Sequence, residues 1–106
     1  MKRAILSVCV VLTSLLATPL FASGDAKKGE EIFEQCSVCH YAHKVEKKMG
    51  PGLKGVTKKE KLHNGEKATE ANILKVVNTG GNGMPAYKDL LTDQERENVM
   101  AYLKTL

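Results

Sequence analysis

Five residues, CSVCH at positions 36–40, constrain this chain more than any other feature of its sequence. The thiols of Cys36 and Cys39 are three positions apart, a spacing at which the two vinyl groups of one haem can alkylate both of them. His40 follows directly and can ligate the iron of the same haem. The motif therefore predicts a covalently attached haem c with His40 as one axial ligand.

Other kinds of site also use cysteine pairs of this spacing. A thiol–disulfide redox pair usually sits at a helix N-terminus in a βαβ unit, and the sequence has no strand-like runs. A zinc site needs four ligands, and beyond the motif only His43 and His63 remain, at spacings that match no common zinc finger. A purely structural role for two buried thiols is a weaker alternative. Haem attachment is the favoured interpretation.

The first 22 residues have the pattern of a secretory signal peptide. A positively charged start is followed by an apolar run over residues 4–16, interrupted only by small polar residues. We expect cleavage after Ala22 and export to the periplasm. An uncleaved membrane anchor is the alternative, but the run breaks at Thr18-Pro19, short of the about 20 apolar residues that span a bilayer.

Cleavage of the first 22 of the 106 residues would leave 84, which we interpret as a single domain, residues 23–106. A protein core alone is thin at this size. The aromatic residues of the mature chain are few: Phe33, Tyr41, Tyr87 and Tyr102. A bound macrocycle would supply the missing buried apolar surface, so the composition also favours a cofactor at the centre of the fold.

Charge is unevenly distributed along the chain. The formal net charge is +4, and loss of Lys2 and Arg3 with the signal peptide would reduce it to +2. No strongly basic, arginine-rich face is present, which argues against nucleic-acid binding. Residues 44–67 contain eight lysines and three glutamates. This segment is either a solvated loop kept soluble by lysine or a docking patch that steers acidic redox partners.

The apolar periodicity predicts three helices and no strands. The first helix has Asp25 as its N-cap and runs into the haem motif. The second is capped by Thr69 and stopped by Gly80-Gly81. Its buried face is expected to consist of Ile73, Val76 and Val77. The third covers residues 92–106 and opens with a capping box.

The third helix carries an apolar face that has to be buried. Its large residues recur at helical spacing: Val99, Tyr102, Leu103 and Leu106. The first helix offers the small Gly29 close to Phe33 as a partner. We therefore expect the two terminal helices to pack together, with Tyr102 against Gly29.

Two loops contain glycine, proline and candidate site residues. Gly-Pro-Gly at 50–52 marks a sharp turn, which is either ordinary punctuation or the source of a carbonyl that accepts a hydrogen bond from His40. The stretch GGNGMP at 80–85 places Met84 in an irregular segment, where its sulfur would serve as the sixth ligand of the iron. Met49 and Met100 are the rival methionines, while His43 and His63 are expected to be exposed.

Together these residues resemble the class I c-type cytochromes, in particular the small monohaem cytochromes c of the bacterial periplasm. The resemblance covers essentially the whole mature chain. The matching segments are GEEIF at 29–33, CSVCH at 36–40, GPGLKGV at 50–56, GMPAY at 83–87 and LTDQERENVMAYLKTL at 91–106. It implies an all-α fold of three to four short helices around one covalently attached haem, with the N- and C-terminal helices packed together.

The resemblance also implies a role for individual residues. It implies thioether bonds at Cys36 and Cys39, axial ligation by His40 and Met84, and support of His40 by the carbonyl of Pro51. In one respect the chain departs from the family. Many relatives hold the haem propionates with an arginine soon after the GPxLxGV segment or with a tryptophan, whereas this chain has Lys58 and Lys59 and no tryptophan. Tyr41 and the lysines are the candidate propionate partners.

The functional hypothesis is a periplasmic single-electron carrier, which is not an enzyme because no substrate bond is made or broken. We expect a monomer that forms brief complexes with redox partner proteins and is not inserted in a membrane after signal cleavage. The alternative is a haem subunit of a larger periplasmic or membrane oxidoreductase. An enzyme with a haem open on one side is disfavoured by the methionine loop.

Overall fold

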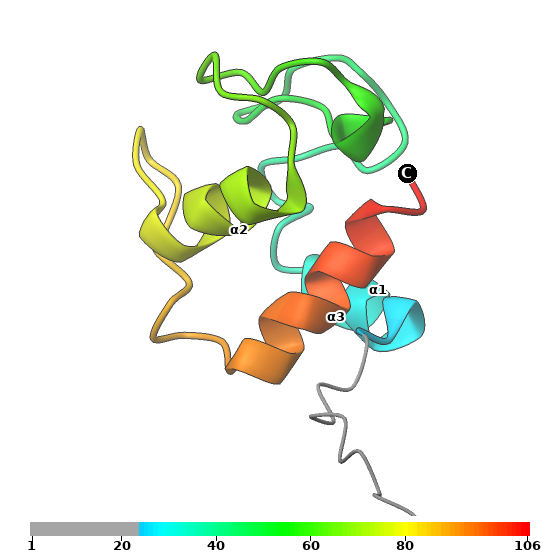
Figure 1. The fold of residues 1–106 in the computed structure, drawn as a ribbon, viewed down its shortest axis with the longest axis vertical. Helices are drawn as coiled ribbons and strands as arrows, with labels where there is room; N and C mark the ends of the chain where they lie inside the picture. The colour runs from blue at the N-terminus through cyan, green and yellow to red at the C-terminus, as the bar shows by residue number, and fades with distance from the viewer. Residues whose placement is uncertain (1–23) are drawn as a thin grey trace, which may run out of the picture.

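The computed structural model describes residues 24–106 as a bundle of short helices connected by long loops (Figure 1). Ala26–Phe33 form α1, Glu70–Thr79 form α2 and Asp93–Leu103 form α3, while Val56–Lys58 form one turn of 3-10 helix, η1. No strand occurs in residues 24–106, which confirms the all-α prediction. The expected signal peptide lies outside the described residues.

None of the helices within residues 24–106 has the length and apolar character needed to cross a membrane.

α1 begins as predicted but ends earlier. The Asp25 carboxylate accepts hydrogen bonds from the backbone N–H groups of Lys27 and Lys28 and so caps the helix. The regular helix stops at Phe33, and the chain continues through a series of turns. The first backbone bonds after Phe33 join residues three apart, from the Glu34 N–H to the Glu31 carbonyl at 3.4 Å and from the Cys36 N–H to the Phe33 carbonyl at 2.8 Å. The last turn thus tightens before the cysteines are reached. The prediction that the first helix runs into the haem motif is therefore wrong.

The capping box of α3 is present as predicted. The Glu95 N–H donates to the Thr92 hydroxyl at 3.1 Å, and the Thr92 N–H donates to the Glu95 carboxylate at 3.0 Å. The apolar residues that were expected at the buried face are all buried: Val99, Tyr102, Leu103 and Leu106. Regular helix ends at Leu103. Beyond it, the backbone oxygen of Leu106 accepts a hydrogen bond from the Gly55 N–H at 2.9 Å.

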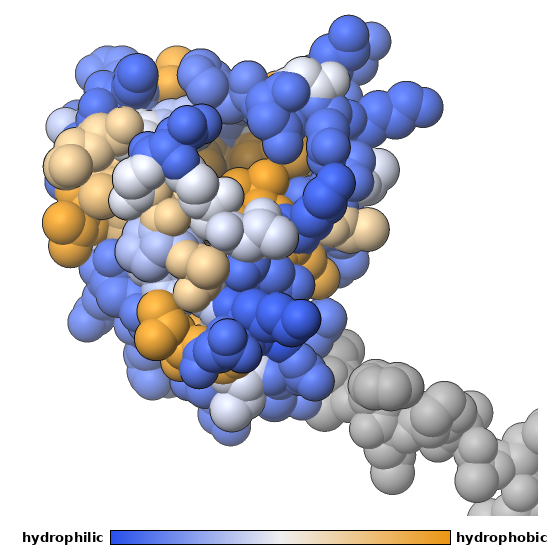
Figure 2. All heavy atoms as spheres, turned by 90° about the vertical axis from the view of Figure 1, so that its left-hand side faces the viewer, coloured by the Kyte–Doolittle hydropathy of each residue, from blue (hydrophilic) through white to orange (hydrophobic). Residues whose placement is uncertain are grey.

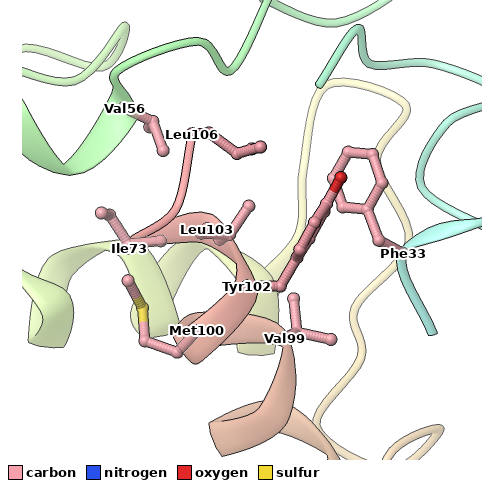
Figure 3. Packing of buried hydrophobic residues seen from close by; sticks show 8 residues of the cluster. All are labelled: Phe33, Val56, Ile73, Val99, Met100, Tyr102, Leu103 and Leu106. Atoms are coloured by element: carbon pink, nitrogen blue, oxygen red, sulfur yellow. The ribbon is translucent and has the colours of Figure 1, made fainter. Parts of the chain in front are cut away.

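α1 and α3 cross in close contact, as expected (Figure 1). A Cβ atom on Gly29 would overlap the Asn98 carbonyl and would lie 2.9 Å from the Tyr102 Cβ, so only glycine allows this approach. One turn further on, the rings of Phe33 and Tyr102 pack with centroids 5.3 Å apart and an interplanar angle of 57°. The buried side chains around them form one cluster (Figure 3).

α2 contributes less to this cluster than its sequence suggests. Ile73 is buried and lies on the same side of the cluster as Met100, the most buried residue at 1% exposure (Figure 3). Val76 and Val77, which were also expected at the buried face, are only half-buried. The C-terminal half of α2 pairs instead with a loop, because the Val77 carbonyl accepts a hydrogen bond from the Tyr87 N–H at 2.9 Å.

Candidate haem-binding site

The cysteine pair lies in the turns that follow α1. The Cys36 N–H donates to the Phe33 carbonyl at 2.8 Å, and the Cys36 carbonyl accepts from the N–H groups of Cys39 and His40 at 3.1 and 2.9 Å. These bonds hold the pair and the histidine on one short piece of backbone. Both thiols are free and half-buried. Burial, with a smaller contribution from Cys39, raises the pKa of the Cys36 thiol, whereas a reactive redox pair depends on a lowered one.

The His40 ring is oriented by a backbone carbonyl on a distant turn. Its Nδ1 lies 2.8 Å from the carbonyl oxygen of Pro51. Because a carbonyl oxygen can only accept, Nδ1 must carry the proton, and Nε2 then keeps its lone pair for a metal. Such a bond fixes both the tautomer and the direction in which the ring presents Nε2.

The Pro51 turn is fastened to the cysteine motif on both sides. The Gly50 N–H donates to the Cys39 carbonyl at 2.7 Å, and the Leu53 N–H donates to the Tyr41 carbonyl at 2.8 Å. A Cβ on Gly50 would lie 2.5 Å from Cε1 of the His40 ring. A side chain at Gly52 would overlap the Lys44 carbonyl. Both glycines are therefore required by close packing around the histidine.

Met84 lies on a separate loop with unusual backbone geometry. Gly81 and Met84 pair through two backbone hydrogen bonds of 2.9 and 3.0 Å. All four residues that precede Met84 have positive φ: Gly80 at 59°, Gly81 at 118°, Asn82 at 52° and Gly83 at 87°. Glycine and asparagine are the residues that adopt such values at low cost. The GGNG sequence is thus what allows the chain to present a half-buried methionine here.

The rival ligands lie elsewhere in the structure. Met49 is 75% exposed, with its sulfur 3.9 Å from the Cys39 sulfur, and Met100 is packed in the core. His43 and His63 are exposed, as expected. Among residues 24–106, no group of three or more histidine, cysteine, aspartate or glutamate side chains could hold a metal ion.

The residues present fit a covalently attached haem. Two free thiols and a correctly oriented imidazole lie on one turn, and a thioether is presented by a loop with a backbone suited to a close approach. Tyr87, three residues after Met84, is buried. Burial is the main cause that raises the pKa of its hydroxyl, and Cys36 and Cys39 raise it further.

All eight lysines in residues 44–67 are exposed. Two of them surround the Tyr41 ring, with the Lys44 and Lys48 ammonium groups 4.9 and 5.2 Å from its centroid. Lys48 also donates to the Ser37 carbonyl at 3.0 Å and so connects this segment to the cysteine turn. In Figure 2, hydrophilic side chains cover most of the upper part of the molecule, where these loops lie.

Sequence reasoning missed two polar residues of α3. Asn98 is buried, and its side-chain oxygen accepts from the Asp25 N–H at 2.9 Å and from Gln94 at 3.0 Å. Asn98 lies one turn before Tyr102, on the side of α3 that packs against Gly29. This position is the signal that could have revealed it. Arg96 makes several contacts with the segment after Met84, and nothing in its sequence neighbourhood predicts them.

Comparisons with known proteins show which family the chain is similar to. A family model described as "Cytochrome C oxidase, cbb3-type, subunit III" matches residues 24–103. Cytochrome c6 from Thermosynechococcus vestitus is 33% identical over 97% of this chain and 91% of its own length. Cytochrome c2 from Rhodospirillum rubrum is 31% identical over 100% of this chain and 99% of its own. The crystal structure of cytochrome c6 from the diatom Phaeodactylum tricornutum superposes with a TM-score of 0.61 at 31% identity, over 77% of this chain and 93% of that one.

The chain therefore belongs to the class I monohaem c-type cytochromes. It carries one covalently attached haem c, and it is an electron-transfer protein rather than an enzyme. The expected fold, with its terminal helices packed together, is confirmed by the structural neighbour and by the contact of α1 with α3.

Proposed function

We propose that this protein is an exported single-electron carrier whose haem is bonded to Cys36 and Cys39 and ligated by His40 and Met84. The hydrogen bond from His40 to the Pro51 carbonyl is the observation that carries the proposal. It fixes the orientation of the ring and leaves the lone pair of Nε2 available for the iron. The relatives named cytochrome c6 and cytochrome c2 support the carrier role. When bound, the haem supplies an iron that cycles between the ferric and ferrous states.

Each side of the site contributes to the redox properties. A methionine sulfur opposite a histidine raises the reduction potential relative to two nitrogen ligands. The hydrogen bond to Pro51 keeps the histidine ring in place while the charge of the iron changes. Buried apolar surroundings, to which Tyr87 contributes, disfavour the extra positive charge of the ferric state. We therefore expect a fairly positive potential.

Replacement of Met84 tests the ligand set. The variant Met84→Ala should lose a ligand, lower the reduction potential on the order of 0.1 V or more, and open the iron to small ligands such as cyanide. Met49→Ala is the matched control, since Met49 is 75% exposed and should leave both properties unchanged. An unchanged potential in Met84→Ala, without new ligand binding, would exclude Met84 as the axial ligand.

The lysine-rich segment is proposed as the docking surface for acidic redox partners. Its eight exposed lysines outnumber the nearby glutamates, of which Glu66 is paired with Lys75 at 3.4 Å. The rate of electron transfer to ferricyanide, a small anionic oxidant, should fall as salt is added. Changing Lys58, Lys59 and Lys61 to Gln should weaken this dependence more than changing Lys27, Lys28 and Lys88, three exposed lysines outside the segment. Equal effects of the two sets would remove the docking patch.

Export to the periplasm and a monomeric state complete the proposal. Cleavage after Ala22 would give a mature chain that begins at Ser23. Intact mass and N-terminal sequence of the protein from the periplasmic fraction would test this directly. A protein that retains residues 1–22 and stays with the membranes would contradict the cleavage.

A haem subunit of a larger oxidoreductase is the second candidate. The description of the matching family model, which names a subunit of cytochrome c oxidase, favours it. Size-exclusion chromatography of a gently prepared extract of the native host distinguishes the two. A carrier elutes near the size of the 84-residue mature chain, whereas a subunit elutes with its complex.

A further inference from the structure

Arg96 is a charged side chain that is nearly buried and faces backbone carbonyls. Its side chain is only 11% exposed, and one of its guanidinium nitrogens, Nη1, faces three backbone carbonyls. The distances are 2.5 Å to Lys88, 3.0 Å to Leu91 and 3.5 Å to Tyr87. The other nitrogen, Nη2, pairs with the Asp93 carboxylate, which is 97% exposed. The donors on Nη1 are therefore directed to backbone.

The carbonyls that Arg96 binds belong to the segment that immediately follows the methionine loop. Tyr87 comes three residues after Met84, and its N–H donates to α2 at 2.9 Å. The Lys88 N–H donates to the Asn78 carbonyl, also in α2, at 3.3 Å. The segment is thus attached to α2 through its N–H groups and to α3 through Arg96.

On the other side of Met84 the backbone has positive φ throughout residues 80–83. The non-glycine residue in this stretch, Asn82, has a φ of 52°, a conformation that costs free energy and persists only when surrounding structure holds it. The loop is attached at its start by the Gly80 N–H, which donates to the Val76 carbonyl at 2.8 Å, and is paired internally between Gly81 and Met84. After Met84, the next attachments are those of residues 87–91. Among them, the bonds from Arg96 are the ones made by a charged donor, and such bonds are the stronger ones.

We propose that Arg96 is a positioning residue that keeps Met84 on the iron by clamping residues 87–91 to α3. This inference rests on the proposed function, because it takes Met84 as the axial ligand. Opening of the loop moves these carbonyls away from the guanidinium, so the bonds of Arg96 oppose dissociation of the sulfur. Lysine cannot replace it fully, since one ammonium does not reproduce the geometry of a guanidinium fork.

Imidazole binding to the ferric holoprotein measures how often the loop opens. Imidazole reaches the iron only when Met84 has left, so its apparent affinity is the intrinsic affinity multiplied by the open fraction. Arg96→Met keeps an apolar stem but removes every donor, and it should raise the apparent imidazole affinity by about tenfold or more. Arg96→Lys should fall between this variant and the wild type. Asp93→Asn, which removes only the exposed partner, should match the wild type.

Urea unfolding of the same proteins separates positioning from a general structural role. If Arg96 merely stabilised the whole fold, Arg96→Met would lower the unfolding midpoint and leave imidazole affinity unchanged; that result would overturn the inference alone. If the ferric wild type itself has no methionine-to-iron charge-transfer band, both the proposed function and the inference are contradicted. Should Arg96→Met not yield folded holoprotein, Arg96→Lys and Asp93→Asn decide, and equal imidazole affinity in these two variants would overturn the clamp.

Discussion

The turn at 50–52 and the loop at 80–85 are both rich in glycine, but for different physical reasons. A side chain at Gly50 or Gly52 would collide with the His40 ring or with the backbone of residues 44–46, so glycine is needed there for space. Around Gly81 and Gly83 there is open space, and glycine is needed because φ is positive. Gly80 needs both, since its φ is 59° and a Cβ there would overlap the Met84 carbonyl. The turn at 50–52 thus depends on close packing alone, whereas backbone conformation is the requirement shared by the glycines of the second loop.

With His40 and Met84 as the proposed ligands, this difference implies different behaviour on the two sides of the haem. The histidine side is held by short hydrogen bonds to the cysteine motif and cannot open without disrupting that motif. The methionine side depends on a few attachments at its ends, chiefly at Tyr87 and Lys88. Regions with few packed contacts open at lower free energy than the core. Dissociation of a ligand and adjustment of the potential are therefore expected on the methionine side.

The largest effect is expected from a side chain on the histidine side. In Gly52→Ala the new Cβ would overlap the Lys44 carbonyl, and backbone cannot move aside as a flexible side chain can. We expect a loss of about 3 kcal/mol or more in the free energy of unfolding, measured by urea denaturation. Gly55→Ala is the control: its Cβ meets open space and only the positive φ of 68° opposes it, at about 1–2 kcal/mol. Similar losses in both variants would mean that packing does not distinguish the turn.

A smaller effect, confined to the methionine side, is expected from Gly83→Ala. This residue has a φ of 87° with open space around it, so the cost comes from the backbone alone and amounts to about 1–2 kcal/mol. The methionine-to-iron charge-transfer band should be lost at lower temperature than in the wild type. Gly83→Asn should restore most of the loss, because asparagine adopts positive φ more readily. Equal losses for alanine and asparagine would contradict the conformational explanation.

The smallest effect is restricted to alkaline pH and concerns Tyr87. Burial raises the pKa of its hydroxyl, with smaller contributions from Cys36 and Cys39 that disappear once these thiols are bonded to haem. The folded protein then keeps this proton to a higher pH than the unfolded chain does. The free energy of unfolding should be insensitive to this group below about pH 10 and should fall as the pH rises further. Tyr87→Phe should make that decline shallower, and an unchanged decline would exclude the contribution of Tyr87.

Features set by local spacing could be predicted from the sequence. Val99, Tyr102 and Leu103 define one face of a helix by their spacing alone, and a glycine in the first helix marks where that face can approach. The capping box at Thr92 is likewise a local pattern. The turn at 50–52 was recognisable as a turn, and a hydrogen bond from His40 to one of its carbonyls was one of two interpretations of it. The assignment of that carbonyl to Pro51 was implied only by the family resemblance.

Features that no local spacing marks, or that depend on distant segments, could not be predicted. The early end of α1 is a change to backbone bonds between residues three apart, which begins at Glu34. The half-burial of Val76 and Val77 depends on which loop pairs with the end of α2. Arg96 lies in a polar stretch of α3, and it is buried only because residues 87–91 fold across it.

The methionine methyl signals of the ferrous protein test the central claim most directly. The chain proposed to remain after cleavage contains three methionines, so labelling their methyl groups with carbon-13 should give three signals. When the sulfur of a methionine binds the iron, the methyl group on that sulfur would lie over the face of the macrocycle. The ring current would then shift its signal far from those of the other methionines. The account predicts one such signal, which persists in Met49→Ala and disappears in Met84→Ala. Three unshifted signals, or a shifted signal that survives in Met84→Ala, would contradict ligation by Met84.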